Sequence, residues 1–221
     1  MLILFILILK FTKTKFMSHV SVSNMPKKYI LLLLMAMLNM IHLSAETLSY
    51  TVFKGNDKIG KINISRTTKN NQTVYFFESN VKLRVILSIE VYDRMKVIFK
   101  GNQMVQADLY RTLNGKVKVN NSATWNGKHY DLKNTDNESN ILSTPVHLTT
   151  ANLYYNEPSN VAAVFSEKFQ KMIPIAHTGD KKYTLKLPNG NRTTYSYANG
   201  VCNMVEADTD WATLRFVRDL K

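Results

Sequence analysis

The stretch Val81-Lys-Leu-Arg-Val-Ile-Leu-Ser-Ile-Glu-Val91 has an apolar residue at every odd position and, apart from Ile86, a polar residue at every even one. Successive side chains of a strand point to opposite faces, so this alternation predicts one strand with its odd positions in the core. At about 3.3 Å per residue the strand would be roughly 36 Å long. A slip of one residue would place all six odd side chains in water, so we expect a firmly set register.

The same parity continues beyond this stretch, with one exception. Met95, Val97 and Phe99 are apolar and odd, whereas Asp93 places a charge among them. A turn or β-bulge at Asp93 explains the exception most simply. The alternative is a carboxylate that points inward for a specific reason.

Turn signals surround further alternating segments along the chain. Asn-Gly occurs at 114–115, 126–127, 189–190 and 199–200, and this pair favours the type I′ hairpin turn, which needs positive φ at both central residues. The turns recur every 10 to 15 residues, which leaves little room for crossover helices. We therefore expect a mainly β protein: an antiparallel meander of about 11–12 strands that curls into a roll or half-barrel.

Two segments interrupt the alternation. Residues 133–143 are polar and predict a surface loop, and residues 145–172 form a long connection without clear alternation. We expect one or two short helices in this connection, one of them at 148–155. The spacing of Val161, Phe165, Phe169 and Met172 fits either a helix or a short buried strand.

The first 45 residues have the composition of a leader. They contain no acidic residue, and from Met25 they follow the order of a signal peptide: Lys27-Lys28, nine apolar residues at 30–38, then Leu43-Ser44-Ala45. A second apolar run at 1–9 precedes this signal, so we expect either that translation starts at Met25 or that the leader is unusually long. We predict cleavage after Ala45 and a single β-rich domain at 46–221, exported to the periplasm or the exterior, with no transmembrane span in the mature chain.

Charge and cysteine content narrow the range of functions. Of 29 basic residues, five precede Ala45, which leaves 24 against 16 acidic ones in the mature chain. They are scattered rather than clustered, as on solvated strand faces, and we do not expect nucleic acid as a partner. Cys202 is the one cysteine, so an internal disulfide is impossible, and its alternation with Met204 predicts a buried apolar side chain.

No established catalytic or cofactor motif is present, so we predict no catalytic residue, cofactor or metal site. His129, His147 and His177 lack the spacing of zinc ligands. Ser143, His147 and Glu157 could be assembled into a triad, as in most chains of this length. Glu206, Asp208 and Asp210 could share a strand face, but a polar turn before the last strand is the simpler interpretation.

One aromatic group on the long connection is a candidate ligand-binding site. Its members are Tyr154, Tyr155, Glu157, Phe165 and Phe169. Such a segment can line the mouth of a curled sheet and contact a ligand. The alternative is that it plugs the open end of the sheet and completes the core.

The turn and aromatic positions resemble a known group of proteins. They are Tyr50, Gly55 and Ile59-Gly-Lys61 near the start, and Thr149-Thr-Ala-Asn-Leu-Tyr-Tyr155, Tyr183, Asn189-Gly190, Tyr195-Ser-Tyr197 and Asn199-Gly200 later. This pattern is similar to uncharacterised families of exported bacterial β proteins known as domains of unknown function. Those families are similar in fold to spiral β-rolls and, more distantly, to periplasmic lipoprotein carriers. The resemblance implies an envelope location and a long coiled sheet, and it implies no activity.

Three functions are compatible with these observations. The first is a non-enzymatic envelope protein that binds an apolar or amphipathic ligand or supports another envelope component, so that a lipid or such a component is its partner. The second is an envelope hydrolase with a pocket on the 139–170 connection. The third is an adhesion or interaction module.

Cleavage of the leader is directly testable. We expect N-terminal sequencing of the protein recovered from its own host to begin at Glu46, because Ala45 offers signal peptidase a small residue after the apolar run. A folded protein that retained Met1 or Met25 would contradict the prediction.

Overall fold

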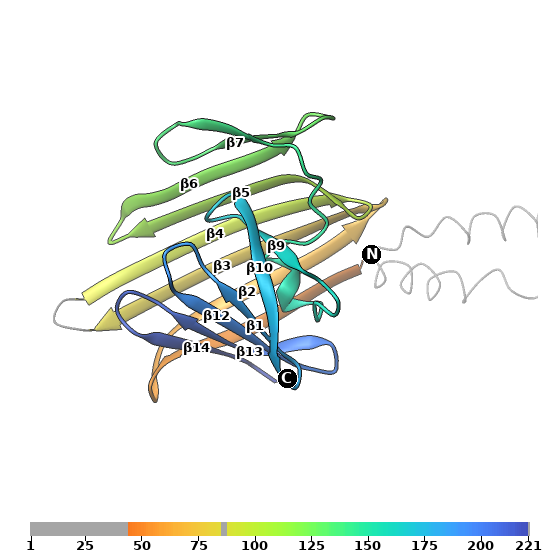
Figure 1. Ribbon diagram of the computed structural model, residues 1–221. Helices are drawn as coiled ribbons and strands as arrows, with labels where there is room; N and C mark the ends of the chain where they lie inside the picture. The colour runs from red at the N-terminus through yellow and green to blue at the C-terminus, as the bar shows by residue number, and fades with distance from the viewer. Residues whose placement is uncertain (1–43, 85–87, 221) are drawn as a thin grey trace, which may run out of the picture. The chain divides into compact units, whose positions relative to one another are not determined.

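Fourteen antiparallel strands form a single sheet in the computed structural model, which describes residues 44–84 and 88–220 (Figure 1). The strands are β1 (Ser44–Lys54), β2 (Asp57–Lys69), β3 (Gln72–Arg84), β4 (Ser88–Lys100), β5 (Gln103–Leu113), β6 (Lys116–Trp125), β7 (Tyr130–Lys133), β8 (Ser139–Leu142), β9 (Ala163–Ser166), β10 (Lys171–Gly179), β11 (Lys182–Lys186), β12 (Arg192–Ala198), β13 (Val201–Asp208) and β14 (Thr213–Arg218). The expected leader falls, but for its last two residues, outside this description.

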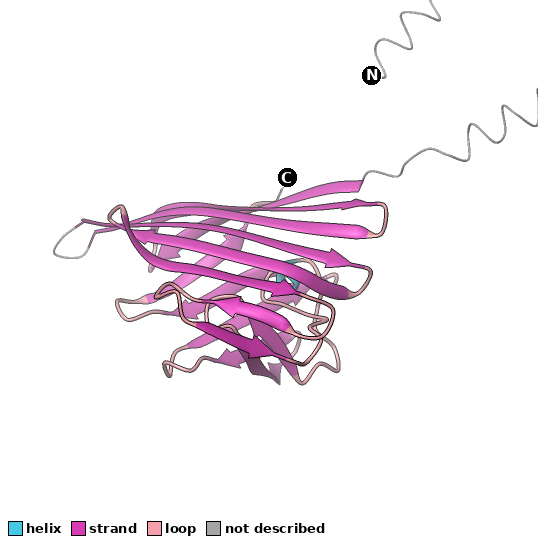
Figure 2. Cartoon of the chain, turned by 90° about the horizontal axis from the view of Figure 1, so that it is seen from above, coloured by secondary structure: helices cyan, strands magenta, loops and turns pink. Residues whose placement is uncertain are grey.

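The order of the strands in the sheet is that of a meander with one long-range join. It runs β8-β7-β6-β5-β4-β3-β2-β1-β14-β13-β12-β11-β10-β9, so β1 pairs with β14 and the edges are β8 and β9. In the two ribbon views the strands from β9 to β14 lie over one face of the strands from β1 to β8 (Figures 1 and 2). The predicted antiparallel meander is confirmed, with 14 strands in place of the expected 11–12.

The alternating stretch at 81–91 is two strands and not one. β3 ends at Arg84 and β4 begins at Ser88, with Val81 opposite Val91 and Leu83 opposite Ile89. Odd residues face odd residues across this hairpin, so the apolar parity continues from one strand into the next. Val81 and Leu83 are buried and Lys82 is exposed, as expected, whereas residues 85–87 lie outside the described chain.

Asp93 lies inside a regular part of the sheet. It pairs with Ser79 of β3 and Arg111 of β5, and the irregularity in the β4–β5 ladder comes later, between Ile98 and Phe99. The expected turn or bulge at Asp93 is therefore wrong. Asp93 is 7% exposed, and the inward-pointing carboxylate that we considered as the alternative is what the structure contains.

All four Asn-Gly pairs connect neighbouring strands, but only two have the expected turn geometry. At 114–115 and 199–200 both residues have positive φ, as a type I′ turn requires. At 126–127 and 189–190 the glycine alone does. Residues 133–143 also differ from the expected loop, because β7 and β8 form a hairpin there with a tip at 134–138.

The long connection from 143 to 162 crosses the interior of the curled sheet. Its helical content in the described chain is one 3-10 turn, η2 (Asn152–Tyr154), and its second half leads into strand β9 rather than a second helix. Val146, Leu153, Tyr154 and Tyr155 are buried. Tyr154 contacts Tyr50 and Tyr195 edge to face, with ring centroids 5.4 and 5.9 Å apart, and so packs between the two halves of the sheet.

Tyrosine hydroxyls link the crossing segment to the strands around it. Tyr197 of β12 donates to the Leu153 carbonyl at 2.8 Å, and Tyr155 donates to the Ile64 carbonyl of β2 at 2.7 Å. Tyr130 of β7 accepts from the Val146 N–H at 3.1 Å and donates to the Met104 carbonyl at 2.7 Å. Burial raises the pKa of Tyr155 and Tyr197, in keeping with neutral hydroxyls enclosed in the core.

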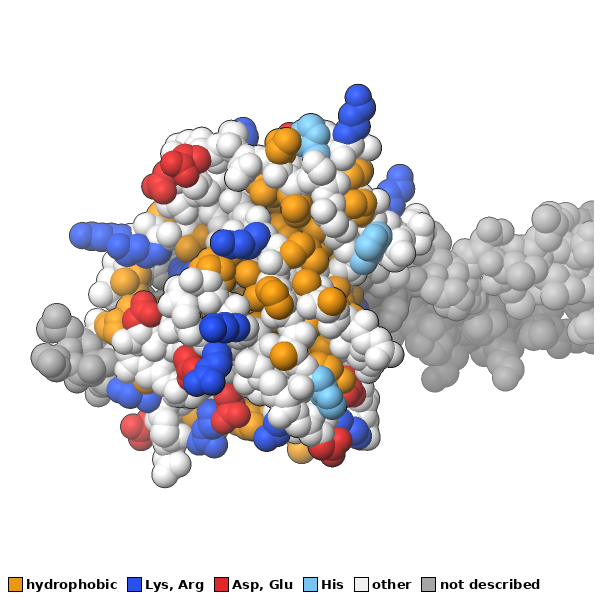
Figure 3. All heavy atoms as spheres, viewed as in Figure 1, with side chains coloured by type: hydrophobic (Ala, Val, Ile, Leu, Met, Phe, Trp, Pro, Cys, Tyr) orange, Lys and Arg blue, Asp and Glu red, His pale blue; other side chains and the backbone are white. Residues whose placement is uncertain are grey.

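The molecular surface carries dispersed charge. On the face shown in Figure 3, lysine and arginine side chains are spread out and stand near acidic ones, around a central group of apolar side chains. No single basic patch dominates that face, in agreement with the scattered positions of these residues in the sequence.

Removing one core hydroxyl tests how the crossing segment is held. Tyr197→Phe should lower the free energy of unfolding by about 1–3 kcal/mol, because the buried Leu153 carbonyl loses its donor. Tyr110→Phe, on the opposite face of the sheet, should cost about 0.5 kcal/mol or less. Urea unfolding of the two variants makes the comparison. Equal losses would mean that the Tyr197 hydroxyl does not hold the segment.

Candidate functional site

A cavity of 280 Å³ lies between the two halves of the sheet. Strands β3 to β5 supply one wall and β11 to β14 the other. Most of the lining side chains are apolar, including Val81, Leu83, Val91, Leu185, Val205 and Phe216. These residues occupy the inward-facing positions of their strands. The walls are therefore apolar because apolar and polar residues alternate along each strand.

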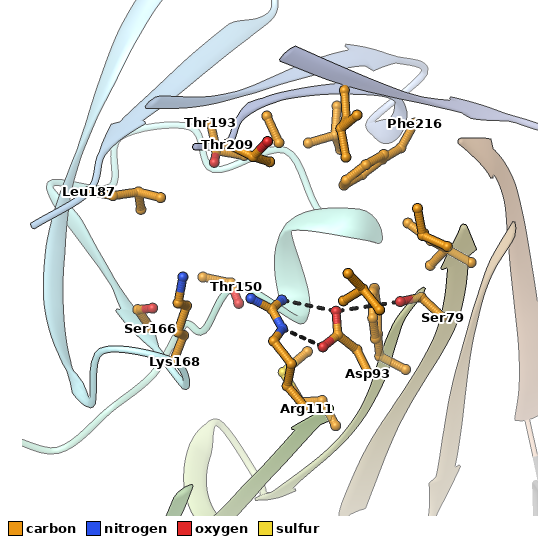
Figure 4. A pocket seen from close by; sticks show the side chains of 18 of the residues that line it. Ser79, Asp93, Arg111, Thr150, Ser166, Lys168, Leu187, Thr193, Thr209 and Phe216 are labelled. Atoms are coloured by element: carbon orange, nitrogen blue, oxygen red, sulfur yellow. Dashed lines mark hydrogen bonds and ion pairs between the residues drawn. The ribbon is translucent and has the colours of Figure 1, made fainter. Parts of the chain in front are cut away.

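One row of polar side chains crosses the wall formed by β3, β4 and β5. Ser79, Asp93 and Arg111 are cross-strand neighbours, and Figure 4 shows them side by side on the cavity. The Arg111 Nε and NH2 groups donate to the two Asp93 carboxylate oxygens at 2.5 and 2.9 Å. The Ser79 hydroxyl lies 3.5 Å from Asp93 Oδ2.

The pair is unequally buried. Asp93 has 10% of its side chain exposed and Arg111 has 32%. Burial alone would lower the pKa of Arg111, but the adjacent Asp93 carboxylate outweighs that effect and raises the pKa. Arg111 is therefore a permanent cation on the cavity wall, and its guanidinium group is turned toward the cavity (Figure 4).

The loop between β9 and β10 brings a second cation to the cavity. Lys168 lines it, and Figure 4 shows its side chain directed toward the space near Arg111. The residue as a whole is exposed, but burial near the ammonium lowers its pKa, and the Arg111 charge lowers it further. Its Nζ lies 5.0 Å from the centroid of the Phe169 ring.

Two side-chain amides fix this loop to the other half of the sheet. Asn121 of β6 donates to the carbonyls of Glu167 and Lys168, at 3.2 and 2.8 Å. Gln170 donates to the carbonyls of Ser122 and Lys133, at 2.8 and 3.0 Å. We call these contacts the amide seam, because they join the β9–β10 loop to β6 and β7 without strand pairing.

Glu167 is a buried carboxyl in the cavity wall. It is 3% exposed, it accepts from the Thr150 hydroxyl at 2.5 Å, and it lies 3.4 Å from the Ala151 N–H. Burial raises the pKa of Glu167 and these hydrogen bonds only partly offset it. The carboxyl of Glu167 therefore accepts its hydrogen bonds from the crossing segment.

The structure separates the five residues expected to bind a ligand. Tyr154 and Phe169 line the cavity. Tyr155 and Phe165 are buried outside its lining, and Glu157 accepts a hydrogen bond from the Tyr183 hydroxyl at 3.1 Å. The five therefore do not form one cluster, and two of them reach the space that a ligand could occupy.

Sequence reasoning singled out Asp93 but missed Arg111, Glu167 and Lys168. Arg111 has the inward parity of Leu109 and Leu113, which was an available signal. Lys168 and Glu167 lie in a turn, where parity carries no information.

The other candidates for chemistry do not assemble. His147 contacts the Asn102 carbonyl at 3.0 Å and forms no hydrogen bond with Ser143 or Glu157 in the described chain. Burial raises the pKa of Cys202 to about 12, so its thiol is a poor nucleophile. Over residues 44–84 and 88–220 there is no group of three or more potential metal ligands among His, Cys, Asp and Glu. The same residues contain no helix with the length and apolar character needed to cross a membrane.

The ionisation of Glu167 should be visible in stability. Because its folded pKa is raised above the ordinary value of 4.5, its contribution is most favourable below that pH and is lost as pH rises through the folded pKa. Glu167→Gln carries no such charge, so its free energy of unfolding should improve relative to wild type between about pH 4 and about pH 8. Urea unfolding at both pH values measures this. A difference that did not change with pH would show that Glu167 is not penalised by its burial.

Comparison with known proteins places the chain in a family. No curated protein matches it in sequence. A crystal structure titled as a β-barrel-like protein of domain of unknown function DUF1849 from Brucella abortus is similar, with a TM-score of 0.46 and 10% identity over 81% of this chain and 97% of that one. Residues 50–219 match DUF6134, a domain of unknown function. Since that match spans most of the sequence, the chain belongs to the DUF6134 family.

Proposed function

We propose that this protein is an exported, non-enzymatic component of the cell envelope that binds an apolar or amphipathic ligand inside its curled sheet. The observation that carries the proposal is the apolar cavity between β3–β5 and β11–β14. Ligand sites are typically concave and mostly apolar, with a few polar groups that orient the ligand. At 280 Å³ this cavity is near the lower end of their usual size, about 300 Å³.

Access to the cavity supports the proposal. Trp211, in the turn between β13 and β14, lines the cavity and is 46% exposed. Thr209 lines it from the same turn, and Leu187 lines it from the turn between β11 and β12 (Figure 4). A ligand could therefore enter between strand ends, where it would pass exposed apolar surface, without breaking a strand ladder.

The expected export is part of the same proposal. Lys27-Lys28, the apolar run and Leu43-Ser44-Ala45 are its warrant. The proposed cleavage point lies within β1, whose first two residues pair with Thr68 and Thr67 of β2. Cleavage after Ala45 would remove those two pairs and leave the Glu46–Arg66 ion pair, at 2.6 Å, next to the new N-terminus.

One observation favours a second candidate function, hydrolysis. The Thr150 hydroxyl donates to the Glu167 carboxyl at the cavity wall, which is the arrangement of a nucleophile beside a base. Steady release of nitrophenol from nitrophenyl decanoate by the wild type, abolished in Thr150→Ala, would favour this candidate over simple binding.

Filling the cavity tests the binding function. Ala207 lines the cavity on β13, whereas Ala176 of β10 is exposed and lies outside its lining. Ala207→Phe should weaken the binding of decanol by about tenfold or more, because the ring occupies the ligand's space, and Ala176→Phe should leave binding unchanged. Fluorescence of Trp211 in a Trp125→Phe background reports binding, since Trp211 lines the cavity and the chain has two tryptophans.

The same titration can reject the proposal. If wild type binds no decanol, the cavity is not a site for an apolar chain. If both phenylalanine variants bind decanol as wild type does, the ligand occupies another place.

A further inference from the structure

The carboxylates that line the cavity are already engaged by the protein. Asp93 accepts from Arg111, and Glu167 accepts from Thr150. Asp208 accepts from the Thr213 hydroxyl at 2.9 Å and lies 3.9 Å from the Arg192 guanidinium group. Each of the three carboxylates therefore already has a partner within the protein.

The two cations of the cavity, Arg111 and Lys168, have fewer partners than the carboxylates. Lys168 takes part in none of the six ion pairs of the described residues. Arg111 has five N–H donors, and within residues 44–84 and 88–220 its hydrogen bonds use two of them, both to Asp93. Positive donors therefore remain at one place on a mostly apolar cavity wall.

The positions of these cations define where an anion would lie. Arg111 comes from β5 and Lys168 from the β9–β10 loop, and both side chains are directed toward the same part of the cavity (Figure 4). Asp93 holds the guanidinium in place, and Asn121 holds the backbone of the lysine's loop. The repulsion between two cations on a low-dielectric wall is relieved by an anion between them.

We propose, resting on the ligand-binding function above, that the ligand carries an anionic head group, a carboxylate or a phosphate, which lies between Arg111 and Lys168. Its hydrocarbon part lies against the apolar walls formed by β3, β4 and β11–β14. Charge-assisted hydrogen bonds of this kind are about twice as strong as neutral ones, so the head group sets orientation as well as affinity.

Matched amphiphiles test the head group. Decanol, decanoate and decyl phosphate share one chain and differ in charge, and each is titrated against Trp211 fluorescence in the Trp125→Phe background. We expect wild type to bind at least one of the two anions about tenfold more tightly than decanol. Lys168→Met should bring the affinity for the anion to within about threefold of that for decanol, and Lys168→Arg should retain most of the preference.

Lys171→Met is the control for a general loss of positive charge. Lys171 is exposed on the same hairpin and does not line the cavity, so the preference for the anion should survive. Circular dichroism checks that each variant is folded. Whichever anion binds more tightly identifies the head group as carboxylate or phosphate, and either result supports the proposal.

Failure of this inference can be told apart from failure of the proposed function. Equal binding of decanol and both anions by wild type would overturn the anionic head group and leave the apolar site standing. A preference for the anion that is unchanged in Lys168→Met would also overturn the assignment. If wild type binds none of the three compounds, both proposals fail.

Discussion

The interior of this sheet depends on satisfying a backbone that crosses it with only an isolated bridge, Thr149 to Phe165, in place of a strand ladder. Residues 143–162 bring N–H and carbonyl groups into the core, and buried groups of this kind need partners. Tyrosine is suited to the task because its ring fills core volume while its hydroxyl reaches a backbone atom. Hydrogen bonds of Tyr130, Tyr155 and Tyr197 connect the segment to β7, β5, β2 and β12. The crossing segment therefore links β1–β8 to β9–β14 in the interior.

The polar row of Ser79, Asp93 and Arg111 explains why the core has a hollow. Apolar side chains of β11–β14 cannot close over a guanidinium–carboxylate pair without removing its remaining water, which is costly. Tyr154 of the crossing segment fills the interior between Tyr50 and Tyr195, and the space that remains lies between Tyr154 and this ion pair's side of the sheet. A buried ion pair is weak evidence for stability, so its place on the cavity wall is one of the reasons for proposing a role in binding.

Much of the fold could be predicted from alternation and turns, but register could not. The reversal between β3 and β4 does not show in the alternation, because the register pairs odd residues with odd ones. The apolar residues therefore stay at odd positions in both strands. Asp93 was recognised as an exception, yet its partner Arg111 depends on the β4–β5 register. The aromatic residues near the site, Tyr154 and Phe169, could be found by composition. Lys168 could not be found, because the direction of a side chain in a turn does not follow from the alternation of the sequence.

The amide seam has a consequence for the width of the interior. In a closed barrel, the number of strands and their stagger fix the diameter, because each strand is bonded to two neighbours. Here the β9–β10 loop is bonded to β6 and β7 by the side chains of Asn121 and Gln170, and a hydrogen bond of this kind contributes only about 1 kcal/mol. The spacing between the β9–β10 loop and β6 therefore depends on side-chain contacts at this seam, and it can change while every strand keeps its register.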